Sequence, residues 1–309
     1  MQLISVVTPC FNEKDNIQEI YQAVREIFSK LTQYHYEHIF IDNSSVDNTI
    51  NILKEIALND SNVKLIINAR NFGWIRSPFY GLLQASGDAV ICMAADFQDP
   101  PFLIKEFIEK WEKGFKIVIG TKSKSEEAFF KFSIRKLYYQ FSDKIADLKL
   151  VKNFTGFGLY DKSVIDIMRE FNDPYPYLRG MISEIGFDTA QIEFKQPKRE
   201  RGFSSSTFFK LYDVAMLGIT THSKLPLRIM SCVGFIFAFT SMLITIFYVF
   251  AKIFFWDKFP LGFASIIIGC FFFFSLQMFF IGLLGEYIAS IHHQVLKRPL
   301  VIEKERVNF

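Results

Sequence analysis

The sequence predicts an α/β domain built around a mostly parallel sheet, followed by interfacial helices and two transmembrane helices. Three observations indicate this architecture. Short apolar runs alternate with helical patterns as far as about Gly120, which is the rhythm of strands joined by helices. Polar residues follow four of the apolar runs. Near the C-terminus stand two long uncharged runs, each of a length that can cross a bilayer.

The composition narrows the class of protein. The 309 residues are 50% hydrophobic and include 37 Phe. The net charge is +3 without a long basic run, so we expect no nucleic acid partner. The four cysteines are widely spaced, which argues against disulfides and zinc. Met1–Phe11 lacks a basic start and a long apolar core. We therefore expect no signal peptide and a cytosolic N-terminal domain.

The expected sheet elements occupy the first 120 residues. The strands are Leu3–Thr8, His38–Ile41, Val63–Ile67, Asp88–Met93 and Lys116–Ile119. The helices between them are Asn16–Leu31, Asn48–Leu58, Ser77–Ala85 and Pro101–Lys113. In a parallel sheet, ligands collect at the carboxyl ends of the strands. Residues that directly follow a strand are therefore the first candidates for a functional site.

Four strand ends carry clusters of polar residues. They are Thr8–Glu13, Asp42–Asp47, Arg70–Gly73 and Asp96–Pro101. Taken singly, two of them have a plain alternative. Asp42–Asp47 and Asp99-Pro100-Pro101 also suit the cap of a following helix. Four such ends converging on one edge of one sheet favour a ligand site.

The two uncharged runs predict a membrane hairpin. Ile229–Ala251 has 23 residues and Phe259–Gly285 has 27. At ~1.5 Å per residue the shorter run reaches ~34 Å, enough for a hydrocarbon core of ~30 Å. The alternative, a pair of buried core helices, would need a soluble partner for which the chain has no residues left. Basic residues flank the outer ends of both runs, for example Arg228 and Arg298. The positive-inside rule then predicts a multi-pass protein of the plasma (inner) membrane with its catalytic domain and both termini cytoplasmic.

Two amphipathic stretches complete the expected organisation. Ser205–Thr221 and Glu127–Leu148 repeat apolar residues at helical spacing beside basic ones. Such helices lie in the membrane surface or pack on the domain, and both alternatives stay open. The expected segments are a cytoplasmic domain at 1–204, a juxtamembrane amphipathic helix at 205–228, the membrane hairpin at 229–289 and a cytoplasmic tail at 290–309.

With these motifs in order, the sequence resembles glycosyltransferase family 2. It is most similar to the polyprenyl-phosphate sugar transferases of that family, such as bactoprenol glucosyltransferases and dolichol-phosphate mannose synthase. The resemblance covers nearly the whole chain. It rests on Val7–Glu13, Ile41–Ser45, Arg70–Gly73, Asp96–Pro101, Arg201-Gly202 and Pro226–Arg228.

The resemblance implies a GT-A-like fold that binds a nucleotide sugar with Mg²⁺ or Mn²⁺. Pro9, Glu13 and Asp42 would hold the base and ribose. Asp96, with Gln98 nearby, would bind the ion and serve catalysis. The further donor-binding candidates are Asn12, Asn43, Arg70, Lys122, Arg135 and Arg199, and Arg201 is a catalytic candidate for clamping phosphate.

Three positions depart from the family pattern. Ala94 takes the place of the first acid of the usual Asp-x-Asp motif. Asn43 stands where many relatives have a second Asp. Some bacterial relatives carry an acid at about Gly156, which leaves Asp161 as the nearest carboxylate and the candidate base.

The expected reaction needs no strong base. A phosphate monoester acceptor is already anionic near neutral pH, because its second pKa is ~6. Direct attack would invert the anomeric carbon. From the resemblance we expect glucose to pass from UDP-glucose to a polyisoprenyl phosphate such as undecaprenyl phosphate, supplying lipid-linked sugar for O-antigen or other cell-surface glycan modification.

Two other functions stay open at this point, and so does a homo-oligomer. A processive polysaccharide synthase usually has a Gln-x-x-Arg-Trp motif. None of Trp74, Trp111 and Trp256 follows an arginine, which argues against it. A non-catalytic membrane scaffold with a decayed site would explain Ala94, and measured turnover would separate it from an enzyme.

Overall fold

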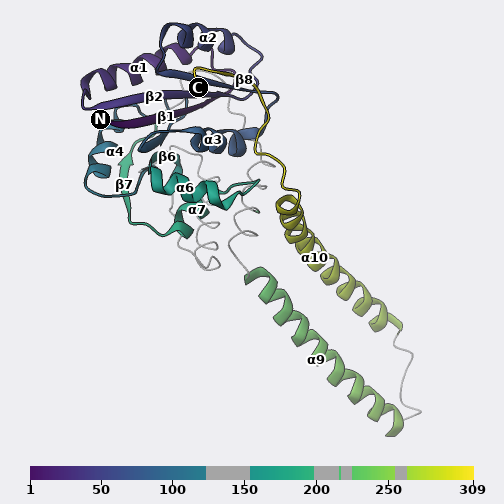
Figure 1. Ribbon diagram of the computed structural model, residues 1–309. Helices are drawn as coiled ribbons and strands as arrows, with labels where there is room; N and C mark the ends of the chain where they lie inside the picture. The colour runs from purple at the N-terminus through teal and green to yellow at the C-terminus, as the bar shows by residue number, and fades with distance from the viewer. Residues whose placement is uncertain (123–153, 198–215, 217–224, 255–262) are drawn as a thin grey trace.

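The computed structural model describes residues 1–122, 154–197, 216, 225–254 and 263–309 (Figure 1). Eight strands form one sheet in the order β7-β5-β6-β4-β1-β2-β3-β8. They are β1 Gln2–Cys10, β2 Tyr34–Asp42, β3 Val63–Asn68, β4 Ala89–Cys92, β5 Ile117–Lys122, β6 Phe154–Asp161, β7 Thr189–Phe194 and β8 Glu303–Val307. The expected stretch Glu127–Leu148 and all of Ser205–Thr221 except 216 lie outside the described residues.

The sheet is mixed, and parallel pairing predominates among the described strands, as expected. Its four central strands, β4, β1, β2 and β3, run parallel. Strands β6 and β8 run antiparallel to their neighbours, and β7 is parallel to β5. The parallel centre brings Cys10 beside Asp42, and Val7 beside Cys92. The carboxyl ends of β1, β2, β3 and β4 therefore meet at one edge.

Helices cover both faces of the sheet. One core layer holds α1 (Ile17–Lys30), α2 (Thr49–Asn59) and α4 (Leu103–Glu112). The other holds α3 (Gly73–Gln84), α6 (Lys162–Phe171) and α7 (Leu178–Ile185). Strands buried on both faces read as continuous apolar runs rather than alternating ones, which explains the apolar strands of the sequence. The domain is a three-layer α/β fold of the GT-A type.

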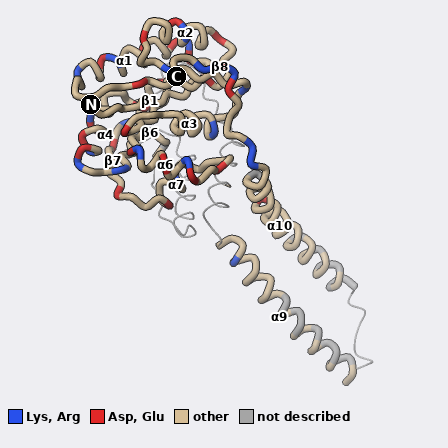
Figure 2. The backbone as a smooth tube through the Cα atoms, in the orientation of Figure 1, with Lys and Arg blue, Asp and Glu red and all other residues tan. Residues whose placement is uncertain are grey.

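Two long helices leave this domain, α9 (Leu225–Phe254) and α10 (Phe263–Val295) (Figure 1). Figure 2 shows Lys, Arg, Asp and Glu spread over the domain and nearly absent along both helices. Over the described residues, one stretch is long and apolar enough to cross a bilayer, Phe272–His292, and none of it is buried within the protein. Leu225–Phe237 is a shorter apolar helix. The second expected membrane span is therefore not confirmed.

The chain returns to the domain after α10. Strand β8 pairs with β3, with Val307 opposite Leu65. The Asn308 side chain donates hydrogen bonds of 2.6 and 2.9 Å to the carbonyl oxygens of Ala57 and Val63. Part of the expected tail 290–309 thus forms the outer strand of the sheet, and the expected domain 1–204 does not contain the whole sheet. The strand covers the edge of β3, which would otherwise be free to pair.

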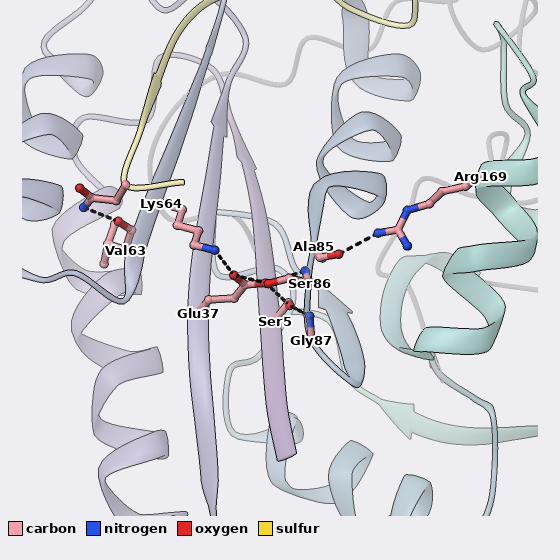
Figure 3. Close-up of polar contacts among 9 residues, drawn as sticks. Ser5, Glu37, Val63, Lys64, Ala85, Ser86, Gly87 and Arg169 are labelled. Atoms are coloured by element: carbon pink, nitrogen blue, oxygen red, sulfur yellow. Dashed lines mark hydrogen bonds and ion pairs between the residues drawn. The ribbon is translucent and has the colours of Figure 1, made fainter. Parts of the chain in front are cut away.

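A buried ionic cluster joins the strands at the edge opposite the polar clusters (Figure 3). Glu37 on β2 is only 3% exposed and meets the Lys64 ammonium at 2.6 Å. Its carboxylate also accepts hydrogen bonds from the Ser5 hydroxyl and from the Ser86 backbone N–H, the latter at 2.8 Å. Burial raises the pKa of Glu37, but Lys64 and these donors outweigh it, so the pKa is lowered. The cluster secures the entry into β4.

Candidate active site

The loops at the shared strand edge hold unusual backbone conformations. Asn12 follows β1, Ser44 follows β2 and Phe97 follows β4, with φ values of 56°, 66° and 58°. Residues other than glycine adopt positive φ at a cost of about 1–3 kcal/mol, and such positions cluster at functional sites. Residue types do not reveal φ, so sequence reasoning missed Ser44 and Phe97. We take these three loops as the candidate active site.

The loops after β1 and β2 are tied together. The Asn12 backbone N–H donates to the Ser45 hydroxyl at 2.8 Å, and the Asn12 side chain accepts from the Val46 N–H at 2.9 Å. The Glu13 N–H donates to the Thr49 hydroxyl at 2.9 Å. Pro9, near the end of β1, lies beside Ile41 in the register. Asn12, Glu13 and Pro9 are thus brought together, by hydroxyls that the sequence did not single out.

Asp42, which was expected to hold the base and ribose of the nucleotide, does not face the solvent. It has no exposed surface, and its two carboxylate oxygens accept from the backbone N–H and the hydroxyl of Ser45, at 2.8 and 2.5 Å. Burial raises the pKa of Asp42, although the bonds from Ser45 and Ser44 oppose the rise. The carboxylate therefore fixes the turn that ties the two loops.

Asn43 organises the third loop through both ends of its amide. Its oxygen accepts from the Phe72 N–H at 2.8 Å and from the Asn68 side chain at 3.1 Å. Its nitrogen donates to the Asn71 side chain and the Gly73 carbonyl, both at 3.1 Å. The Phe72 N–H lies at the start of a helix and has no partner within it, so Asn43 supplies the acceptor. Helix α3 consequently begins at Gly73, four residues before the expected Ser77.

The loop after β4 brings two carboxylates and a lysine together. Asp96 is half-buried and accepts from the Gln98 N–H at 3.2 Å. Asp99 is buried and accepts from the Ala94 N–H at 3.0 Å. Burial raises the pKa of Asp99 to about 6; the negative charge of Asp96 raises it further, while the Ala94 bond and Lys122 act against the rise. The site thus holds charges of both signs.

These residues can be tested for their fit to a divalent ion. Within the described part of the chain, no group of three or more His, Cys, Asp or Glu side chains is arranged to hold a metal. Mg²⁺ commonly binds through one or two carboxylates together with substrate phosphates. A single half-buried Asp96 beside Gln98 suits an ion whose coordination is completed by a diphosphate.

Asp161 lies away from this edge. Strand β6 runs antiparallel to β4, so its last residue, Asp161, pairs with the first residue of β4, Ala89. Its carboxylate caps α6 and accepts from Trp111 at 2.8 Å and Lys116 at 3.0 Å. Burial raises its pKa, but the bonds from Ser163, Trp111 and Lys116 outweigh burial, and the pKa is lowered. Its carboxylate is thus engaged with structural partners at the far end of the sheet, and its expected role as a base stays a prediction.

The remaining candidates are arginines. Arg70 is exposed at the third loop, where its guanidinium lies 4.0 Å from the Phe72 ring centre and donates to the Asn71 carbonyl at 3.1 Å. It stands close to the residues organised by Asn43. Arg135, Arg199 and Arg201 lie outside the described residues, so their predicted phosphate contacts stay predictions.

Charged groups at the carboxyl ends of parallel strands suit a phosphate-containing ligand. The domain that carries them is that of a glycosyltransferase. The chain belongs to glycosyl transferase family 2, whose family model matches residues 5–167. It is 33% identical to the bactoprenol glucosyl transferase of Shigella phage SfX, over 98% of this chain and 99% of the relative. It is also 33% identical to the uncharacterized glycosyltransferase YkcC of Bacillus subtilis (strain 168), over 96% and 92% of the two chains.

Solved structures give more distant matches. Mannosyl-3-phosphoglycerate synthase from Rubrobacter xylanophilus aligns with a TM-score of 0.48 and 17% identity, over 70% of this chain and 71% of that one. Glucosyl-3-phosphoglycerate synthase from Mycobacterium tuberculosis, in complex with UDP, aligns with a TM-score of 0.45 and 17% identity, over 71% and 78%. The family membership rests on the sequence matches alone.

Proposed function

We propose that this glycosyltransferase moves a hexose from a nucleotide sugar to a polyisoprenyl phosphate at a membrane. The observation that supports the proposal most is the full-length match to relatives named bactoprenol glucosyl transferase, which extends through the long apolar helices. The apolar stretch Phe272–His292 suits a transferase whose acceptor lies in a membrane. Those names favour glucose as the sugar, and we propose UDP as the nucleotide that carries it.

The chemistry at the strand edge is the stabilisation of a leaving diphosphate. Mg²⁺ or Mn²⁺ bound by Asp96, with Gln98 beside it, would neutralise the charge that develops there. Lys122, at the end of β5, adds a fixed positive charge on the same side. The acceptor phosphate attacks the anomeric carbon directly and inverts it. Since a phosphate monoester is already ionised near neutral pH, no protein base is required.

The donor's nucleotide is proposed to bind over the tied loops after β1 and β2. Pro9, Asn12 and Glu13 line this side, while Asp42 and Asn43 act as positioning residues because their side chains are buried and bonded within the protein. Arg135, Arg199 and Arg201 remain proposed phosphate contacts, whereas Arg70 lies against the Phe72 ring and the Asn71 carbonyl.

The membrane arrangement is also part of the proposal. We place α9 and α10 across the inner membrane as a hairpin, with the domain and both termini in the cytoplasm. The return of β8 to the sheet supports this in one respect: β7, which precedes α9 in the chain, and β8, which follows α10, belong to the same sheet. The product would be a lipid-linked sugar for cell-surface glycans.

The test is transfer of radiolabelled sugar by the full chain in membranes or detergent. A panel of nucleotide sugars, UDP-glucose among them, is offered with undecaprenyl phosphate. We expect label in the organic-extractable lipid with one donor, dependent on the acceptor. If no nucleotide sugar in the panel gives transfer, the result favours the scaffold alternative. A polymeric product would favour a polysaccharide synthase.

A further inference from the structure

Three arginines from distant parts of the chain gather where α10 meets the domain. The guanidinium carbons of Arg70 and Arg76 lie 4.0 and 5.4 Å from the centre of the same Phe72 ring. Arg76 also donates to the Pro299 carbonyl at 2.6 Å, which brings the preceding residue, Arg298, to the same place. Figure 2 shows basic residues where the chain leaves α10 for the domain. We name Arg70, Arg76 and Arg298 the arginine cluster.

The cluster lacks a compensating acid among the described residues. Arg70 and Arg76 use their guanidinium groups on backbone carbonyls and the Phe72 face, and neither forms an ion pair with a described carboxylate. The Nε of Arg76 is buried without a hydrogen-bond partner in the part of the chain described. Burial lowers the pKa of Arg76, and the charges of Arg70 and Arg298 lower it further. Three like charges held together in this way favour an external anion.

The position of the cluster indicates the source of that anion. The apolar stretch of α10 ends at His292, and Arg298 follows six residues later. The headgroup layer on each side of a bilayer is roughly 5–8 Å thick, the difference between the full bilayer and its hydrocarbon core shared over two sides. Six residues reach at least ~9 Å beyond the apolar stretch, and the long side chain of an arginine can extend back from there to headgroup level. Anionic lipids concentrate phosphate there and attract basic groups.

We propose that the arginine cluster is a binding surface for the headgroup phosphates of anionic phospholipids. Two of its members belong to the catalytic domain and one to the segment after the membrane helix. Lipid binding would therefore hold the catalytic domain against the bilayer surface, in addition to the anchoring provided by α10. This surface is separate from the Asp96 site, and it rests on the membrane position of α10.

The surface has a consequence for the active site. Arg70 and Arg76 flank the start of α3, and Asn43 holds that start through the Phe72 N–H and the Gly73 carbonyl. Lipid contact at the cluster would place the third loop of the site next to the bilayer. An acceptor whose phosphate lies at headgroup level could then reach the strand edge without leaving the membrane.

The experiment measures which lipids the full chain retains. The protein is purified in a non-ionic detergent and offered equal amounts of phosphatidylglycerol and phosphatidylcholine, and retained lipids are counted by native mass spectrometry. We expect a preference for phosphatidylglycerol. The double variant Arg70→Gln/Arg298→Gln, at two exposed positions, should reduce that preference roughly 10- to 30-fold. Arg76 is left intact because it holds Pro299.

Two matched variants control for charge and for folding. Arg70→Lys/Arg298→Lys keeps both charges and should keep most of the preference. Arg25→Gln/Lys30→Gln removes two charges from α1, away from the cluster, and should keep it as well. Equal loss in the α1 variant, or no preference in the wild-type protein, would overturn the proposal. Intact thermal unfolding of the Gln variant shows that lost lipid is not lost fold.

Competition distinguishes the lipid from other anions. If inorganic phosphate at the lipid's concentration displaces phosphatidylglycerol, the cluster is a free-phosphate site and the proposal fails. If UDP-glucose displaces it and the Gln variant no longer binds UDP-glucose, the arginines belong to the donor site and the proposal fails. Retention under both competitors supports the lipid surface. Because lipid retention is not an activity, this result is independent of whether transfer is observed.

Discussion

The Ala94 backbone N–H donates a hydrogen bond of 3.0 Å to the buried carboxylate of Asp99. The alternative that Asp99 caps the next helix is therefore not what the structure shows, since α4 begins only at Leu103. The bond closes the loop from which Asp96 projects. Where the family usually has an acid, this chain has Ala94, and the backbone of Ala94 contacts the carboxylate of Asp99. Asp96 is therefore the half-exposed acid of the loop.

Asp96→Asn should remove nearly all transfer while leaving the fold intact. Losing the charge that holds the ion should lower kcat/KM by at least about 100-fold, or roughly 2.7 kcal/mol of transition-state stabilisation. The thermal unfolding midpoint should hardly change, because Asp96 is half-buried. Chelation of the native enzyme should abolish transfer, and Mg²⁺ or Mn²⁺ should restore it. Near-native transfer by the variant, or indifference to chelators, would show that the metal proposal is wrong.

Asp99→Asn is the matched control for Asp96→Asn, because it changes the other carboxylate of the same loop. The amide keeps an acceptor for the Ala94 N–H, and burial, which raises the pKa of Asp99 to about 6, makes the loss of its charge easier to tolerate. We expect transfer within about 10-fold of the native rate. A loss as large as that of Asp96→Asn would mean that Asp99 shares the metal role.

Asn43→Asp should damage the protein although it restores the family's usual residue. The Asn43 amide nitrogen donates two hydrogen bonds, to Asn71 and Gly73, and a carboxylate cannot donate either one. Asn71 and Gly73 would each lose a hydrogen bond, and a carboxylate would replace the amide at the buried position 43, at a cost of about 1–3 kcal/mol. We expect a lower unfolding midpoint and a higher KM for the nucleotide sugar. An unchanged midpoint would contradict the positioning role of Asn43.

Glu37→Gln should destabilise the domain in a pH-dependent way. The pKa of Glu37 is lowered in the folded protein, chiefly by Lys64 and the hydroxyl donors against the effect of burial. Its contribution is therefore complete above the unfolded-state value of ~4.3 and is lost as the pH falls through the lower folded value. At pH 7 the variant should be less stable by about 1–3 kcal/mol.

The difference in unfolding midpoint between wild type and Glu37→Gln should shrink as the pH drops below about 4. Glu26→Gln serves as the control, because Glu26 pairs with Lys30 on the exposed surface of α1 and such pairs contribute little. A difference that does not change with pH would contradict the ionic role of Glu37.

Asp161→Asn should affect stability rather than catalysis. The carboxylate caps α6 and binds Lys116 at 3.0 Å, at the end of the sheet away from Asp96. We expect a loss of about 1 kcal/mol or somewhat more in unfolding free energy. The kcat at permissive temperature should stay near the native value. A large fall in kcat with an unchanged unfolding midpoint would instead support a catalytic role for Asp161.

The sequence by itself determined the local elements of the first 120 residues and their order. Apolar runs placed the four central strands to within a few residues, for example Val63–Ile67 against Val63–Asn68. The polar residues that follow them were expected at one edge of the sheet, and the structure brings them there, because parallel strands carry their carboxyl ends to the same side. The family motifs around Asp96 and Asn12 could be read in the same way, since each is a short local pattern.

Only the tertiary structure decided what depends on pairing between distant segments. Strand direction put Asp161 at the far edge, since β6 runs antiparallel to β4. Strand β8 joined the sheet from beyond α10, and its charged, short pattern gives no local sign of a partner. Asn43 occupies a position expected to bind the donor, yet its amide is used within the protein. Hydrogen-bond partners and strand neighbours depend on how distant segments pack against one another, so local sequence patterns do not specify them.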